Sequence, residues 1–330
     1  MVRAVSEHVF ATTVALHRNF DDLPFHLKMP EDAAACVKRT LKASQALEDK
    51  YYLFPVKDLD DCFLHEMEDK WLVPPTIKEK PEANLFIRHD NRVSISVGES
   101  DHLTVRFPLV SDAKTAAKEL DDIARILADG YAYATDPQFG HLTVSLRHAG
   151  TGVQVARVLH LPVMHMLKQI PNLAKELAQA GHFELSPLRT KQHEAGALYV
   201  LTNRFAQQPT DDMVAHMDET IQSLIQREIT LREGIFKEIR NRNYEDQVMR
   251  SFGILCYARK LPHKEFMAHW SNIRLGACVG LIDTNLQVID QLFWDARPTQ
   301  LLLNAQGQAD ERAMNYLRAD MVRARLTGGH

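Results

Sequence analysis

Cysteine and histidine side chains carry most metal and redox chemistry in proteins, and in this sequence they are widely spaced. The four cysteines form no close C-x-x-C pair of the kind that zinc sites and thiol redox centres favour. The sixteen histidines are scattered, and no H-E-x-x-H motif occurs. We therefore expect buried free thiols and no metal site. The cysteines are Cys36, Cys62, Cys256 and Cys278.

The composition is typical of a folded, soluble protein. With 330 residues, of which 45% are hydrophobic and 25% charged, the chain can bury a substantial core. Its 39 basic and 43 acidic residues give a net charge of −4, and no segment concentrates the basic ones. We therefore expect no nucleic-acid partner and no membrane binding. The sequence has neither a signal-peptide pattern nor a run of about 18 apolar residues, which favours a cytoplasmic protein.

The first third of the sequence predicts two helices followed by strands. Apolar residues recur every three or four positions in segments 31–48 and 57–72, as they do in amphipathic helices. Three short alternating runs come after Pro81, and we expect consecutive antiparallel strands there. These runs are 84–88, 92–97 and 102–107.

Helix and strand patterns interleave in the middle of the sequence. We expect Ser111 to cap an amphipathic helix that extends to about Ala132. A second helix should begin at Pro162 and end at Gly181, a natural C-cap. Strand character appears at 142–145, 153–159, 183–185 and 198–202.

The last third is helical from Asp211 almost to its end, with an interruption at Asn241-Arg242-Asn243. We therefore predict an α+β domain over residues 1–240 and a small all-helical domain over residues 241–330.

Three segments of the predicted α+β domain resemble motifs of the ATP:guanidino phosphotransferases, in the same order. Residues 10–22, FATTVALHRNFDD, are similar to the S-R-I-R-L-A-R-N-L-D-D element. The turn in residues 93–106, VSISVGESDHLTVR, resembles N-E-E-D-H-L-R. Residues 140–162, GHLTVSLRHAGTGVQVARVLHLP, resemble G-x-L-T-x-C-P-T-N-x-G-T-G-L-R-A-S-x-x-x-H-L-P with the spacing intact.

A fourth segment, residues 250–281, is similar to the helical C-terminal domain of the bacterial protein-arginine kinases. The resemblance therefore spans most of the chain. It implies the guanidino-kinase fold, with an antiparallel sheet flanked by helices, and a homodimer built through the C-terminal helices. So small a helical unit is not expected to bury all of its apolar residues, and the exposed ones would form the dimer interface. The candidates are Phe252, Leu255, Phe266, Trp270, Ile273 and Leu275.

The resemblance implies a phosphate site made of five arginines, because a guanidinium stays charged and donates to phosphate oxygens. Only the fifth position has a counterpart, Arg189. Arg18 and His102 are also retained from the motifs, so we assign Arg189, Arg18 and His102 as candidate nucleotide-binding residues. The other four arginine positions carry Thr13, Ala15, Thr104 and Gln154.

Other basic residues near the missing arginines offer a way to rebuild the phosphate site. Strand alternation places Arg157 on the opposite face from Gln154, so Arg157 is a poor substitute. The basic residues closest in sequence are His17, Arg18, Arg106, Arg147 and Arg157.

The resemblance implies that carboxylates hold the guanidinium of the acceptor substrate and remove its proton. Glu99 and Glu194 are the candidate catalytic acids. Ser100 replaces the second glutamate of the turn and cannot pair with a guanidinium charge. Without that partner, we expect Glu99, Asp101 and His102 to serve mainly in shaping a hairpin turn.

Protein-arginine kinases also carry a phosphoarginine-binding R-D-x-x-R-A motif in their C-terminal helices. When its end is aligned with Arg318-Ala319, Met314 and Asn315 stand at the Arg-Asp pair. We therefore expect this helix to pack through its apolar side rather than to bind phosphoarginine.

An intact fold with most of its phosphate-binding charge removed favours a pseudokinase that acts as a regulatory or scaffolding protein without a cofactor. The alternative is an active protein-arginine kinase that uses Mg-ATP at a rebuilt site. A small-molecule guanidino kinase is disfavoured by the C-terminal helices. The resemblance further implies protein partners, among them a small zinc-binding activator protein, and a role in protein quality control.

Overall fold

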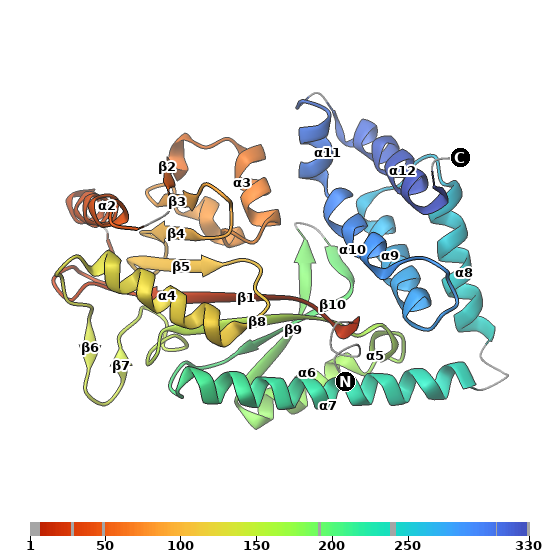
Figure 1. The fold of residues 1–330 in the computed structure, drawn as a ribbon, viewed down its shortest axis with the longest axis horizontal. Coiled ribbons are helices and arrows are strands. Elements are labelled where there is room, and N and C mark those ends of the chain that lie inside the picture. Colours follow the sequence, from red (N-terminus) through yellow and green to blue (C-terminus); the bar gives the residue numbers. More distant parts are fainter. Residues whose placement is uncertain are drawn as a thin grey trace.

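The computed structural model describes residues 7–27, 30–47, 50–190, 193–237, 242–307 and 309–328. An eight-stranded antiparallel sheet with helices against it is followed by a group of C-terminal helices, which confirms the predicted fold class (Figure 1). The strand order is β2-β3-β4-β5-β1-β8-β10-β9, and β6-β7 form a separate pair. The strands are β1 (Val9–Arg18), β2 (Tyr51–Pro55), β3 (Asn84–Arg88), β4 (Ser94–Val97), β5 (Leu103–Phe107), β6 (Thr135–Asp136), β7 (Gly140–His141), β8 (Val153–His160), β9 (Phe183–Thr190) and β10 (His193–Asn203).

The helices fall into two groups along the chain. Those of the sheet domain are α2 (Pro30–Ser44), α3 (Asp61–Asp69), α4 (Ala113–Ala128), α5 (Pro162–Met166), α6 (Ile170–Ala180) and α7 (Thr210–Lys237), with the short 3-10 helices η1 (Val56–Asp58) and η2 (Pro75–Glu79). The C-terminal group is α8 (Arg242–Tyr257), α9 (His263–Cys278), α10 (Leu286–Asp295), α11 (Pro298–Asn304) and α12 (Glu311–Thr327). None of the helices in the described residues is long and apolar enough to cross a membrane.

One face of the sheet is covered by α4 and α7, which lie in front of it in Figure 1. The Asp112 side chain caps α4 by accepting from the Lys114 amide, and the apolar side of α4, including Leu120, is buried against the sheet. Val14 and Leu16 of β1 enter this core. Because successive strand residues point to opposite faces, the residues between them lie on the other face.

That other face is covered at one end by the C-terminal helices. Ala11, Val158 and Leu198 of the sheet belong to the same buried core as Trp270 and Phe293. At the opposite end, β2, β3, α3 and η2 enclose a smaller core of their own. The middle of the face, between these two cores, is formed by β1, β5 and β8.

Two predicted elements are wrong in detail. Residues 142–145 form a loop rather than a strand, because the Val144 amide donates to the Asp101 carboxylate instead of to a neighbouring strand. The helix predicted from Pro162 to Gly181 is two helices, α5 and α6, separated where Lys168 takes a positive φ of 55°. Pro171, which suits the first turn of a helix, lies in the first turn of the second one.

The C-terminal helices bury more apolar side chains than expected. Leu255, Phe266, Trp270, Ile273 and Leu275 are all at most 2% exposed. The expectation that not all six candidates are buried holds only for Phe252, which is partly buried, and the sheet contributes part of the core around the C-terminal helices. The predicted domain boundary after residue 240 lies outside the described residues.

Candidate functional site

Strand register brings together the four positions at which the arginines of the family pattern are replaced. Ala15 of β1 pairs with Arg106 of β5 on one side and with Gln154 of β8 on the other. His17 of β1 pairs with Thr104 of β5. Directly paired residues, and residues two apart in a strand, share a face of the sheet. This surface, the central polar face, consists of Thr13, Ala15, His17, Thr104, Arg106 and Gln154.

The charge of Arg106, the guanidinium on this face, is already balanced. Its Nη2 lies 2.8 and 3.0 Å from the two carboxylate oxygens of Glu99, and its Nη1 donates to Ser96 Oγ at 3.0 Å. Both side chains of the ion pair are largely buried, with 13% and 10% exposure. A phosphate group at this face would therefore compete with Glu99 for Arg106.

Arg18 is buried and turned away from the face into the loop before β8. Its guanidinium donates to Asp121 at 2.8 Å and to the carbonyls of His17 and Thr151 at 2.9 Å. Burial lowers the pKa of Arg18, while the Asp121 carboxylate opposes that shift. Gly152 makes room for this arrangement, since a Cβ there would lie 2.3 Å from Arg18 Nη1.

The two remaining arginines near the missing positions are also paired with carboxylates. Arg157 reaches the opposite face of the sheet, where its Nη2 lies 2.7 Å from Asp218 of α7. Arg147 is exposed and lies 2.8 Å from Glu184. Alternation of side chains along β8 thus separates Arg157 from Gln154 as expected.

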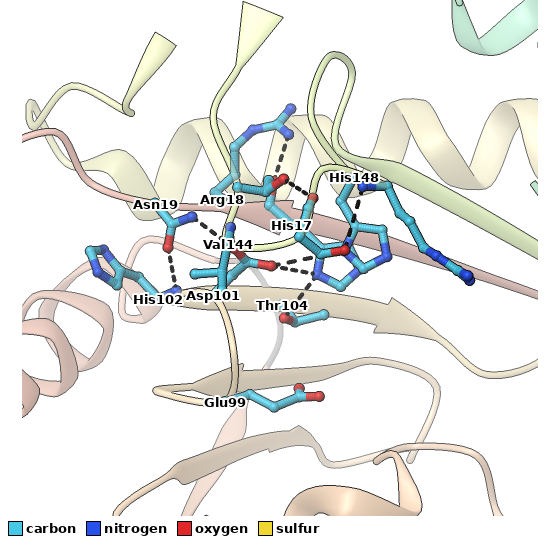
Figure 2. Close-up of polar contacts among 12 residues, drawn as sticks. His17, Arg18, Asn19, Glu99, Asp101, His102, Thr104, Val144 and His148 are labelled. Carbon is cyan, nitrogen blue, oxygen red and sulfur yellow. Dashed lines mark hydrogen bonds and ion pairs between the residues drawn. The ribbon is translucent and has the colours of Figure 1, made fainter. Parts of the chain in front are cut away.

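Asp101 is the centre of a buried polar network beside the face (Figure 2). Its Oδ1 accepts from Asn19 Nδ2 and from the Val144 amide, both at 2.8 Å. Its Oδ2 lies 3.2 Å from His17 Nδ1 and 3.9 Å from His148 Nδ1. Burial alone would raise the pKa of Asp101, but hydrogen bonding from His148, His17 and Val144 outweighs it, so the pKa lies below its ordinary value.

The rings of His17 and His148 are stacked, with centroids 3.8 Å apart and planes 11° from parallel. Burial lowers the pKa of His17 to about 4, so its imidazole is neutral at pH 7. Three buried atoms of this group have no well-formed hydrogen bond within the described part of the chain: His17 Nε2, His148 Nδ1 and Asp101 Oδ2.

His102 has a structural position. Its Nδ1 accepts from the Phe20 amide at 3.0 Å, so its Nε2 carries the proton and donates to the Pro24 carbonyl at 2.8 Å. Its own amide donates to Asn19 Oδ1 at 2.8 Å. These contacts tie the turn to the segment after β1.

A pocket of about 550 Å³ opens beside this turn. The turn residues Gly98 to His102 line it together with residues 25–27 and 79–83 and Val144. Ser100, which stands in place of a family glutamate, is exposed at its edge. Glu79 and Glu82 also line the pocket, and they come from a segment without a recognisable motif.

The predicted roles of Arg189 and Glu194 stay predictions. Their backbones are paired across β9 and β10, which places the two residues opposite each other. Their side chains lie outside the described residues.

Sequence reasoning missed the grouping of His17, Asp101 and His148. Each comes from a different motif segment, so spacing along the chain gives no sign of their proximity. A signal exists in the motifs themselves, because His17 stands at an alanine position and His148 at an asparagine position of the family patterns.

Comparisons with known proteins agree with this fold and these motifs. Residues 32–231 match the family model "ATP:guanido phosphotransferase, C-terminal catalytic domain", and residues 241–329 match "Protein-arginine kinase McsB C-terminal domain". Among solved structures, the duplicated taurocyamine kinase from Schistosoma mansoni has a TM-score of 0.60 at 16% identity, over 77% of this chain and 40% of that longer chain. A lombricine kinase structure has a TM-score of 0.58 at 15% identity, over 72% of this chain and 70% of that one.

Curated relatives match over nearly the whole length. The protein-arginine kinase of Caldanaerobacter subterraneus subsp. tengcongensis is 26% identical over 99% of both chains. The protein-arginine kinase of Bacillus subtilis is 24% identical over 97% of this chain and 90% of its own. This chain therefore belongs to the ATP:guanido phosphotransferase family, within the branch of the bacterial protein-arginine kinases.

Proposed function

We propose that this chain is a cytoplasmic pseudokinase of the protein-arginine kinase branch, which binds protein partners in regulation or scaffolding without transferring phosphate. The charge balance of the central polar face carries the proposal. Phosphoryl transfer depends on positive groups that neutralise the transferred phosphate. The four positions at which the family pattern has phosphate-binding arginines are uncharged here. The guanidinium of Arg106 is neutralised by Glu99.

The acceptor side supports the same reading. Ser100 has no charge with which to hold a substrate guanidinium. Glu99 is held by Arg106, and Asp101 Oδ1 already accepts two hydrogen bonds. The defects thus affect both the donor side and the acceptor side of an in-line transfer. Such a transfer requires the donor and the acceptor to be held in register.

An active protein-arginine kinase is the second candidate, and the full-length match to proteins of that name favours it. Members of the family use Mg-ATP, so the active form would use it too. Arg189 and Glu194 would then serve as the remaining phosphate-binding arginine and catalytic acid.

Calorimetric titration with Mg-ATP separates the two candidates. The pseudokinase should give no binding heat up to millimolar nucleotide. A Glu99→Gln variant provides an internal comparison, because it releases Arg106 from its carboxylate and should raise the affinity for ATP. Micromolar binding by the unmodified protein that is lost in Arg106→Ala or Arg189→Ala would establish the kinase instead.

We also propose two kinds of protein partner, a second copy of this chain and a small zinc-binding activator protein. The match of residues 241–329 to the protein-arginine kinase C-terminal domain supports both. Exposed apolar side chains on α8, including Tyr257 at 77% exposure, support the first. Membership of this branch of the family supports the further proposal that the chain takes part in protein quality control.

A further inference from the structure

Trp71 has a backbone conformation that tryptophan rarely adopts. Its φ is +59°, in the left-handed region, where a bulky side chain is strained. Its amide donates to the Glu68 carbonyl at 2.9 Å, so the residue continues directly from the end of α3. Strain of this kind persists only where the surrounding structure holds the residue in place. The contacts of the Trp71 ring therefore show what holds it.

Trp71 and the residues that follow it are buried in different cores. Trp71 packs against the core of the C-terminal helices, whereas Leu72 and Val73 are buried in the small core of β2, β3, α3 and η2. The two parts adjoin here, and α3 lies beside α11 (Figure 1). Adjacent residues of one segment thus attach it to the small core on one side and to the C-terminal helices on the other.

Arg297, the residue before α11, holds the Trp71 ring from the C-terminal side. Its guanidinium carbon lies 4.3 Å from the ring centroid of Trp294, 4.5 Å from that of Phe293 and 5.8 Å from that of Trp71. Burial lowers the pKa of Arg297 to about 10, with the Asp69 carboxylate opposing the shift, so the group is charged at pH 7. Contacts between a cation and aromatic rings are stronger when they are buried, and Arg297 is only 6% exposed.

The segment that begins at Trp71 ends as one wall of the pocket of about 550 Å³. Residues 79–83 line that pocket together with the turn after β4. Ile77 is buried in the small core, and the Val56 amide donates to the Ala83 carbonyl at 2.9 Å, so the segment is anchored at its middle and at its end. Trp71 provides the anchor at its start.

We propose that Trp71 is a strained clamp through which the C-terminal helices hold the pocket wall of residues 79–83. The contacts of its ring with Trp294 and Arg297 maintain the left-handed backbone, so release of the ring lets Trp71 relax and loosens the segment that follows. A shift of α10 or α11 thereby reaches the pocket. A change at the pocket wall reaches these helices in return, because coupling between two sites is reciprocal. The clamp is independent of the proposed pseudokinase function.

Hydrogen–deuterium exchange of the full chain, read by mass spectrometry, tests the clamp from its C-terminal side. Arg297→Met removes the guanidinium but changes no residue of the segment itself. Exchange in residues 75–83 should become about tenfold faster or more, because local opening there becomes easier. Arg323→Met is the matched control. It removes another partly buried guanidinium of the C-terminal helices, one that donates to the Ala258 carbonyl, and should leave exchange in residues 75–83 unchanged.

Trp71→Gly tests the clamp from the other side, because glycine adopts a φ of +59° without strain and only the ring is lost. Exchange should become faster both in residues 75–83 and in α11, while β1 and β8 stay protected. Asn91→Gly changes a residue with a φ of +58° on an exposed turn and should alter neither region. Unchanged exchange in residues 75–83 in Arg297→Met and Trp71→Gly would overturn the proposal. Equal acceleration in β1 and β8 would also overturn it, since that indicates a general loss of stability.

Discussion

Each arginine whose side chain the structure describes near the central polar face has a carboxylate within ion-pair distance. Arg106 pairs with Glu99 on the face itself, and Arg18 pairs with Asp121 inside the fold. Retention of a guanidinium in a motif is therefore a weak guide to phosphate binding. The local partner decides whether its charge is available, and the partner becomes known only from the structure.

Unmodified protein incubated with Mg-ATP and an unfolded arginine-containing substrate should form phosphoarginine only at background level, with or without a zinc-binding activator. Mass spectrometry under conditions that preserve acid-labile phosphate would measure it. A robust signal that Arg189→Ala or Glu194→Ala removes would contradict this expectation.

Nucleotide binding should be recoverable by adding arginine where the face has room. Thr13 and Gln154 are partly exposed, whereas Thr104 is 1% exposed and leaves no space for a guanidinium. Thr13→Arg/Gln154→Arg should raise Mg-ATP affinity by about tenfold or more, since charged hydrogen bonds contribute about 1.5–3 kcal/mol each. Calorimetry would measure the change. Gln207→Arg/Gln208→Arg adds the same charge on an exposed loop, and an equal gain there would refute a local effect.

Gly152 should tolerate no side chain. Its φ is +73°, and a Cβ would lie 2.6 Å from the His17 carbonyl as well as close to Arg18. Gly152→Ala should lower the free energy of unfolding by about 2 kcal/mol or more. Gly181→Ala is the matched control, because φ there is +85° but nothing lies within 4 Å, so only about 1 kcal/mol should be lost. Urea denaturation would measure both, and equal losses would exclude the steric explanation.

At the scale of elements, β8 and α9 are joined by a buried polar contact. Arg274 of α9 is fully buried and pairs with Asp290 at 2.7 Å. Its Nη1 also lies 3.0 Å from His160 Nδ1, and His160 Nε2 lies 2.9 Å from Ser271 Oγ. The imidazole must be neutral to accept from Arg274, and burial, followed by the charge of Arg274, lowers the pKa of His160 well below its usual value.

This contact should make the fold sensitive to acid. A histidine whose pKa is lower in the folded chain stabilises the fold fully above the unfolded pKa of about 6.5, and that contribution is lost as pH falls further. His160→Gln keeps an acceptor for Arg274 and a donor for Ser271 but does not titrate. The free energy of unfolding should therefore fall less steeply between pH 6.5 and 5 in this variant, by up to about 1.4 kcal/mol per pH unit. Denaturation curves across that range with identical slopes would contradict the assignment.

The elements themselves could largely be predicted from the sequence. The expected strand at 84–88 coincides with β3, and the amphipathic helix after Ser111 is α4. Long-range contacts could not be predicted, because they depend on register. The pairing of Ala15 with both Arg106 and Gln154 is one case, and the grouping of His17 with Asp101 and His148 is another.

For the whole molecule, the surface available for self-association differs from the one expected. Trp270 and Phe266 are in the interior, while α8 and α12 expose other apolar side chains. Apolar residues that remain exposed near one another are typical of interfaces. These residues are Met249, Ile254, Tyr257, Tyr316 and Leu317.

The chain should form a homodimer through this surface. Light scattering at tens of micromolar should give twice the chain mass, and Tyr257→Glu should shift the protein towards monomer because it places a charge in the interface. Leu146→Glu changes a residue of similar exposure, 80%, on the loop before β8 and should leave the dimer intact. A monomer at this concentration before any substitution would refute the prediction.

The small core around β2, β3 and α3 is also in direct contact with the C-terminal helices. Thr299 of α11 hydrogen-bonds to Asp69 at the end of α3, and the rings of Trp71 and Trp294 meet edge to face with centroids 5.2 Å apart. The sheet, the small core and the C-terminal helices thus each contact the other two parts, through three interfaces. Opening one interface leaves the parts joined through the other two, so separation requires two to break together. Three parts in mutual contact favour all-or-none unfolding of the chain. The same arrangement resists the single-hinge motion by which two-lobed enzymes close over a ligand.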